Sequence, residues 1–153
     1  MVALPHSHNL RIGRTSEIGR AYLVTTVTQG RVPLFADFNL ARLAVRELRA
    51  CDEKGLCDTL TFVLMPDHLH WLLQLRAGCL ADLVKRFKSV SGAVLNRMRD
   101  APCVPVWQAG FHDHAIRDDA DMQDIARYIV ANPVRAGLVE SVRLYPHWDA
   151  VWL

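Results

Sequence analysis

The sequence contains no apolar run long enough to cross a membrane, and its first residues lack the pattern of a secretory signal peptide. Its four cysteines are scattered and include no Cys-x-x-Cys pair. This scatter argues against a zinc knuckle and indicates reduced, mostly structural thiols. Internal repeats are also absent from the sequence. We therefore expect a cytoplasmic protein built as a single unit.

Lysine is scarce: only three of the 18 basic residues are lysine, and the others are arginine. The net charge is only +2, but the positive charge is unevenly distributed. Residues 1–35 hold four arginines against one glutamate, and residues 79–100 hold five basic residues against two aspartates. Two basic patches on a nearly neutral chain predict a polyanion bound at defined places. Each patch taken alone is equally compatible with an ordinary solvated face.

The length of 153 residues, with 51% hydrophobic and 22% charged residues, is sufficient for the core of one domain. Residues 1–19 are polar with little periodicity, so we expect a basic N-terminal arm followed by one domain over residues 20–153. Strand patterns cover 21–29, 59–65, 68–75 and the second half of 106–117, and helical patterns cover 38–54, 79–99 and 121–132. This order predicts an α+β domain of ferredoxin-like type, with an antiparallel sheet and helices on one face.

The most informative stretch is MPDHLHWLLQL, from Met65 to Leu75. Alternate side chains of a β-strand share a face, so His68 and His70 project to one side, roughly 6–7 Å apart, and apolar residues project to the other. Neutral imidazole is a common metal ligand. The pair is therefore a candidate metal site, although two histidines on the solvated face of an antiparallel strand would show the same pattern.

A second candidate group lies in the helical segment 121–132, DMQDIARYIVAN. Tyr128 and Asn132 are four residues apart, so they share one face beside the buried stripe of this helix. Taken alone, the tyrosine would be a packing residue and the asparagine a helix-end residue. Together with two strand histidines and two basic patches, they become a candidate nucleophile and a candidate third metal ligand.

The combination of these motifs in this order resembles the single-tyrosine HUH transposases, in the REP-associated branch related to small insertion-sequence transposases. MPDHLHW followed by YIVANPVRAGLV is specific as an ordered pair, whereas His-x-His alone would not be. The matching stretches span most of the chain: RIGRTSEIGRAYLVTTVTQGRVPLF at 11–35, MPDHLHWLL at 65–73, LVKRFKSVSG at 83–92, VWQAGFHDHAIR at 106–117 and ARYIVANPVRAGLV at 126–139.

The resemblance implies the HUH endonuclease fold and a role for each candidate residue. His68 and His70 would bind a divalent ion, Mg²⁺ or Mn²⁺, with Asn132 as the third ligand and Tyr128 as the nucleophile. The implied activity is that of a DNA transposase that cleaves and rejoins single-stranded DNA beside hairpin, REP-like sequences through a 5′-phosphotyrosine intermediate. The expected partners are single-stranded and hairpin DNA, with no membrane, and the expected state is a monomer or homodimer associated with the nucleoid.

Further basic and histidine residues are candidate DNA contacts. His112 and His114 form a second His-x-His, and we expect them to face DNA or to support the ligands rather than to join His68 and His70 around one ion. The candidate DNA-binding cations are Arg11, Arg14, Lys85, Arg86 and Lys88.

Two other functions remain open from the sequence. A metal-dependent hydrolase of small phosphodiesters would use the same histidines and leave Tyr128 structural. A domesticated protein that binds hairpin DNA would retain the same site residues but would have lost transposition activity. A covalent protein–DNA adduct separates the first alternative from the transposase, and cleavage assays on hairpin oligonucleotides separate the second.

Overall fold

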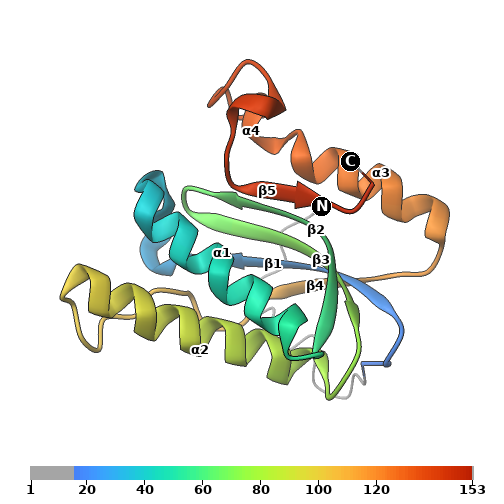
Figure 1. Ribbon diagram of the computed structural model, residues 1–153, viewed down its shortest axis with the longest axis horizontal. Helices are drawn as coiled ribbons and strands as arrows, with labels where there is room; N and C mark the ends of the chain where they lie inside the picture. The colour runs from blue at the N-terminus through green and yellow to red at the C-terminus, as the bar shows by residue number, and fades with distance from the viewer. Residues whose placement is uncertain (1–15, 153) are drawn as a thin grey trace.

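The structure, a computed structural model, describes residues 16–152 and contains one five-stranded antiparallel sheet in the order β4-β1-β3-β2-β5 (Figure 1). The strands are β1 (Ala21–Val27), β2 (Cys57–Met65), β3 (His68–Leu75), β4 (His112–Ile116) and β5 (Trp148–Ala150). The helices are α1 (Phe38–Glu53), α2 (Leu80–Arg99), α3 (Asp119–Val130) and α4 (Asn132–Arg135), with short 3-10 turns η2 (Gln29–Arg31), η3 (Leu34–Ala36) and η4 (Val142–Leu144).

The strand β3, which carries the two histidines, lies at the centre of the sheet. It pairs with β2 through a hairpin whose turn is Pro66-Asp67, with Met65 opposite His68. On its other side it pairs with β1 over the whole length of β1. A central strand is hydrogen-bonded along both edges, so the backbone beneath the two imidazoles is fixed on both sides. The predicted hairpin and third strand are confirmed.

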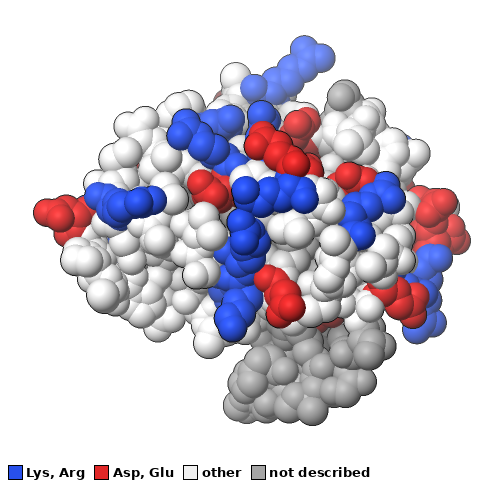
Figure 2. All heavy atoms as spheres, turned by 60° about the horizontal axis from the view of Figure 1, so that its bottom comes forward, with Lys and Arg blue, Asp and Glu red and all other residues white. Residues whose placement is uncertain are grey.

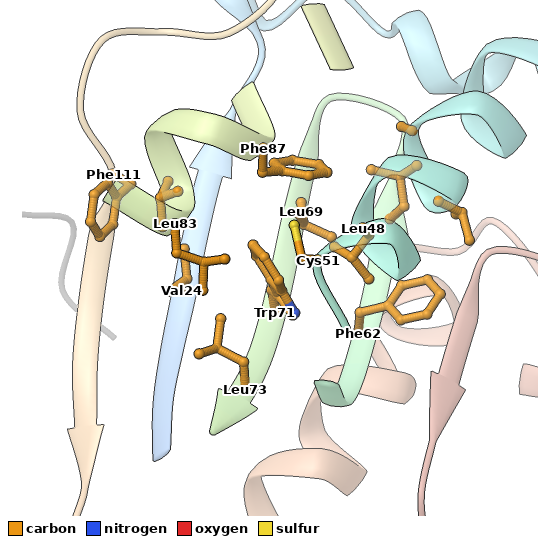
Figure 3. Packing of buried hydrophobic residues seen from close by; sticks show 14 of the residues in the cluster. Val24, Leu48, Cys51, Phe62, Leu69, Trp71, Leu73, Leu83, Phe87 and Phe111 are labelled. Atoms are coloured by element: carbon orange, nitrogen blue, oxygen red, sulfur yellow. The ribbon is translucent and has the colours of Figure 1, made fainter. Parts of the chain in front are cut away.

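The two faces of β3 belong to different cores. Leu69, Trp71 and Leu73 pack in the larger cluster with residues of α1 and α2, and Figure 3 shows Trp71 between the sheet and these helices, beside Phe87. Leu72, on the histidine face, packs in a second cluster with residues of α3. The alternation read from the sequence therefore separates two buried layers.

The α+β class and the antiparallel sheet are confirmed, but the prediction of helices on one face is wrong in detail. Helices α1 and α2 cover one face, and α3 covers the other (Figure 1). The histidine face also carries apolar residues of three other strands, and these require cover. They are Ala21, Val63 and Ile116.

The C-terminal third differs from the sequence prediction at two points. The predicted helix 121–132 ends at Val130, and α4 then begins at Asn132, with Pro133 inside its first turn rather than acting as a stop. Proline is tolerated there because the first N–H groups of a helix have no intrahelical acceptor. The tail also adds the short edge strand β5, which its three residues were too few to reveal.

The predicted arm lies mostly outside the described residues, and with it Arg11 and Arg14. Its last residues contact the domain: Gly19 N–H donates to the Leu75 carbonyl (2.7 Å), and the Ser16 hydroxyl accepts from Leu80 N–H at the start of α2 (2.9 Å). Across residues 16–152, no helix is both long and apolar enough to span a membrane.

Replacing Trp71 with alanine tests the two-layer assignment. Trp71 is fully buried, lies 5.4 Å from the Phe87 ring between centroids, and donates to Thr59 Oγ1. We expect Trp71→Ala to lower the free energy of unfolding by about 3–5 kcal/mol, measured by urea denaturation. Trp152→Ala, at a partly exposed tryptophan, is the control and should cost far less. Equal losses for the two variants would contradict the assignment.

Candidate active site

The imidazoles of His68 and His70 lie side by side on the α3 face of the sheet. Their ring centroids are 4.9 Å apart and the rings meet edge to face. Both side chains are half-buried. The structure therefore brings together the two residues that the strand pattern placed on one face.

His68 is fixed through its Nδ1 atom. This nitrogen lies 2.7 Å from Asp67 Oδ1, and the other carboxylate oxygen of Asp67 accepts from Arg31 Nη1 at 3.0 Å. Burial acts to raise the pKa of Asp67, but the hydrogen bonds and positive charge of His68 and Arg31 outweigh it and lower the pKa below its usual value. Asp67 is thus a carboxylate that accepts from Nδ1–H of His68, so the nitrogen that remains for a ligand in the uncharged ring is Nε2.

The turn before this contact has an unusual backbone. Within η2, Gly30 and Arg31 adopt φ values of 65° and 53°. A positive φ is uncommon for a residue with a side chain and costs on the order of 1 kcal/mol. Thr28 N–H and hydroxyl both donate to the Asp67 carbonyl and join this turn to the hairpin. The strained turn therefore delivers the Arg31 guanidinium to Asp67.

His70 is fixed by a neighbouring strand. Its Nδ1 lies 2.9 Å from Thr25 Oγ1, and Thr25 is its direct cross-strand partner in β1. Burial, followed by the charges of His68 and Arg135, lowers the pKa of His70 to about 4. His70 is therefore neutral near pH 7, and in the tautomer that donates Nδ1–H to Thr25 its lone pair lies on Nε2.

Tyr128 and Asn132 are linked to each other by Arg135. Nη2 of Arg135 donates to the Tyr128 carbonyl (2.6 Å) and to Asn132 Oδ1 (2.9 Å). Its guanidinium carbon also lies 3.8 Å from the centroid of the Tyr128 ring, a cation–π contact. Tyr128 is 60% exposed, so its side chain is accessible from solvent.

The two candidate groups lie on the same side of the sheet. Helix α3 packs on the histidine face, and the charge of Arg135 contributes to the lowered pKa of His70. His112 also belongs to this face, because Thr25 pairs with His70 on one side and with His112 on the other. His114 pairs with Leu23 and is exposed.

The predicted cations of α2 are not part of this group. Lys85 and Arg86 are exposed on a helix that covers the opposite face of the sheet. Lys88 Nζ donates to the carbonyls of Gln108 and Gly110. Figure 2 views the side on which α2 lies and shows a band of basic side chains with acidic ones among them. These cations thus lie away from the two imidazoles.

The two histidines could supply two ligands of a divalent ion, and the remaining ligands must come from other groups. Over the described range 16–152, no group of three His, Cys, Asp or Glu side chains could hold a metal. Each imidazole can bind an ion through a lone pair on Nε2, which gives two ligands, and a third must be an amide, substrate or water oxygen. The Asn132 amide qualifies chemically, and its buried Nδ2 has no partner among the described residues.

Several residues of the site were not identified from the sequence. Asp67 could have been found, because it directly precedes His68. Thr25 and Arg31 required the strand register and the turn geometry. Arg135 follows Pro133, beyond the predicted helix, and no periodic signal marked it.

A family model described as "Transposase IS200 like" matches residues 20–132. This match spans most of the chain, so the protein belongs to the IS200-like transposase family, a family of DNA-cleaving enzymes.

The chain is also similar to REP-associated tyrosine transposases, as the sequence motifs predicted. A Haemophilus influenzae protein assigned to this group is 28% identical over 139 residues, which is 84% of this chain and 78% of that protein. The REP-associated tyrosine transposase of Escherichia coli is 29% identical over 85 residues, 56% of this chain and 49% of that protein. The aligned part thus spans about half the length of the E. coli relative.

Two solved structures share the fold. One is a REP-associated tyrosine transposase bound to a REP hairpin, with a TM-score of 0.73 and 20% identity over 88% of this chain and 79% of the other. The other is a protein from Deinococcus radiodurans assigned as a transposase, with a TM-score of 0.56 and 19% identity over 74% of this chain and 92% of the other. The predicted HUH fold is confirmed.

The lowered pKa of His70 predicts a pH-dependent stability. Between the usual pKa of 6.5 and about 4, the unfolded chain binds a proton at His70 that the folded chain does not. The free energy of unfolding should therefore decrease as the pH is lowered through this range. At pH 4 the loss from this group, relative to neutral pH, should be about 3 kcal/mol. Urea denaturation should show a smaller loss between pH 7 and 4 for His70→Gln than for wild type. Parallel pH dependences would refute this assignment.

Proposed function

We propose that this protein cleaves and rejoins single-stranded DNA beside hairpin sequences, through a 5′-phosphotyrosine formed on Tyr128. The observation that carries the proposal is the pair of imidazoles fixed through Nδ1, on the face of the sheet that α3 covers with its exposed tyrosine. The hairpin is inferred from the similar REP-associated proteins, one of which was solved with a REP hairpin.

The reaction would exchange one phosphoester for another. The Tyr128 oxygen attacks phosphorus and loses its proton, a tyrosine–phosphate bond forms, and the bond to the 3′ oxygen breaks. The departing oxygen takes a proton and becomes a free 3′-OH. Because the phosphoester is conserved, the reverse attack by a 3′-OH rejoins DNA without ATP.

His68, His70 and Asn132 would hold a divalent ion, Mg²⁺ or Mn²⁺, which supplies Lewis-acid polarisation of the scissile phosphate. Asp67 and Thr25 would hold the two rings through Nδ1 and leave Nε2 of each ring for the ion. Arg135 keeps the Tyr128 ring in place by stacking, so the hydroxyl is presented in one orientation rather than many.

DNA binding would extend beyond the cleavage face. Lys85 and Arg86 lie on the α2 side of the sheet and, with Arg11 and Arg14, would contact backbone phosphates of the hairpin. Lys88 belongs to the same surface, where a phosphate would share its ammonium group with two loop carbonyls. This separation suits a substrate with a duplex held at one place and a flexible strand cut at another.

One subunit would be sufficient for cleavage. Helix α3 packs on the sheet of its own chain, in a cluster with Leu72 of the histidine strand. The charge of Arg135 also contributes to the lowered pKa of His70 in the same chain. These intrachain contacts support a site in which Tyr128 serves its own histidines.

Removing the Tyr128 hydroxyl tests the nucleophile. Tyr128→Phe keeps the ring that stacks on Arg135 and should abolish the covalent adduct with a hairpin oligonucleotide that carries a single-stranded flank, while hairpin affinity stays within about twofold. Tyr145→Phe is the control: its hydroxyl donates to the Leu64 carbonyl in the core, so the variant should lose stability and keep adduct formation. An adduct formed by Tyr128→Phe would sink the assignment, and a metal-dependent cut without any adduct in the wild type would favour hydrolysis.

Mixing two inactive variants tests the single-subunit site. His68→Ala and Tyr128→Phe should each be inactive, and an equimolar mixture should stay inactive because no chain contains a complete site. Recovery of about a quarter to a half of the wild-type rate would show that the tyrosine acts on the histidines of another subunit. Adduct formation on denaturing gels measures both outcomes.

A further inference from the structure

The geometry points to Arg135 as a competitor of the metal ion: we propose that its guanidinium holds the Asn132 side-chain oxygen in the metal-free enzyme and gives it up when the divalent ion binds. This inference rests on the proposed function, in which Asn132 is a ligand. Arg135 would thereby couple metal binding to the position of Tyr128, because it contacts both residues.

The contact with Asn132 fixes the orientation of the amide. Oδ1 faces Arg135 and accepts a hydrogen bond at 2.9 Å, while Nδ2 is buried and has no partner in residues 16–152. A reversed amide would place N–H groups against the cationic guanidinium, which donates only. The one good ligand atom of Asn132 is therefore engaged by a cation.

A divalent ion and this guanidinium exclude each other for two reasons. Coordination by Oδ1 redirects its electron density to the ion and weakens the bond to Arg135. Two positive charges on one oxygen also repel, and Arg135 is near enough to His70 for its charge to act there. Metal affinity should thus be lower with Arg135 present than without it.

The displaced guanidinium would remain useful to the reaction. Among the described residues, Nε and Nη1 of Arg135 have no hydrogen-bond partner, and the side chain is exposed beside the Tyr128 ring. A planar guanidinium matches the oxygens of a phosphate. We assign these groups to the phosphate that Tyr128 attacks, so that release from Asn132 and capture of substrate occur together.

The test measures two quantities that a merely structural role would move together. Mn²⁺ affinity of the full chain, without DNA, is measured by calorimetric titration or from the EPR signal of free Mn²⁺. Arg135→Leu should bind Mn²⁺ about tenfold more tightly than wild type. Adduct formation at saturating Mn²⁺ should nevertheless slow about a hundredfold, because the ring of Tyr128 loses its stacking partner and the phosphate loses its clamp.

Arg127→Leu is the matched control. Arg127 is an exposed arginine next to Tyr128 in the sequence, and it pairs with Asp124 rather than with Asn132. It should leave Mn²⁺ affinity within about twofold, since a single exposed charge is strongly screened. If Arg135→Leu does not fold, as thermal unfolding would show, Arg135→Gln removes the charge with a smaller change of shape and should give the same two shifts.

The variant Asn132→Ala distinguishes a failure of the proposed competition by Arg135 from a failure of the proposed metal site. If Asn132→Ala binds Mn²⁺ as wild type does, Asn132 is not a ligand and the proposed metal site is wrong. If Asn132→Ala weakens Mn²⁺ binding, Asn132 remains a ligand. If Arg135→Leu then weakens Mn²⁺ binding or leaves it unchanged, only the competition between Arg135 and the ion is contradicted. The proposal predicts that Arg135→Leu tightens Mn²⁺ binding more in the wild-type background than in Asn132→Ala.

Discussion

The site depends on the hydrogen bonds made by the two Nδ1 atoms of the histidine strand. Asp67 fixes one ring from the hairpin turn, and Thr25 fixes the other from the neighbouring strand. Because an imidazole has only two nitrogens, engaging Nδ1 decides which atom remains for a ligand. The carboxylate of Asp67 is in turn held by Arg31 from a backbone turn with positive φ values. A strained segment thus stabilises the orientation of one ring.

The layered fold explains how polar groups can occupy the centre of a sheet. The opposite face of β3 is packed by Leu69, Trp71 and Leu73 against α1 and α2, so most of the apolar packing of the strand does not involve its histidines. His70 is half-buried on the face that α3 partly covers, and burial is the main cause of its lowered pKa. The same helix carries Tyr128.

Sequence reasoning predicted what depends on local periodicity. The histidine strand, the hairpin and the α2 boundaries follow from alternation, turn residues and helical spacing, and the structure places them within a residue or two of the prediction. The packing of α3 on the second face could not be predicted from the sequence of β3, because this strand places polar histidines on that face. The apolar residues beside them come from other strands, and only the strand register shows that they lie there. Thr25 reaches the site through a contact between strands far apart in the chain, whereas Arg135 reaches it because the chain continues as α4 beyond Val130, where α3 ends. No pattern within one segment could reveal the contact of Thr25 with His70.

The central claim is that two fixed imidazoles of one chain present their Nε2 atoms to a single divalent ion below the tyrosine helix. The most direct test is a crystal structure of the full chain with Mn²⁺, with the ion located by its anomalous scattering. We expect one strong peak within about 2.0–2.2 Å of Nε2 of both His68 and His70. A peak bonded to only one of the rings, or a well-ordered site elsewhere with the histidine pair unliganded, would contradict the account.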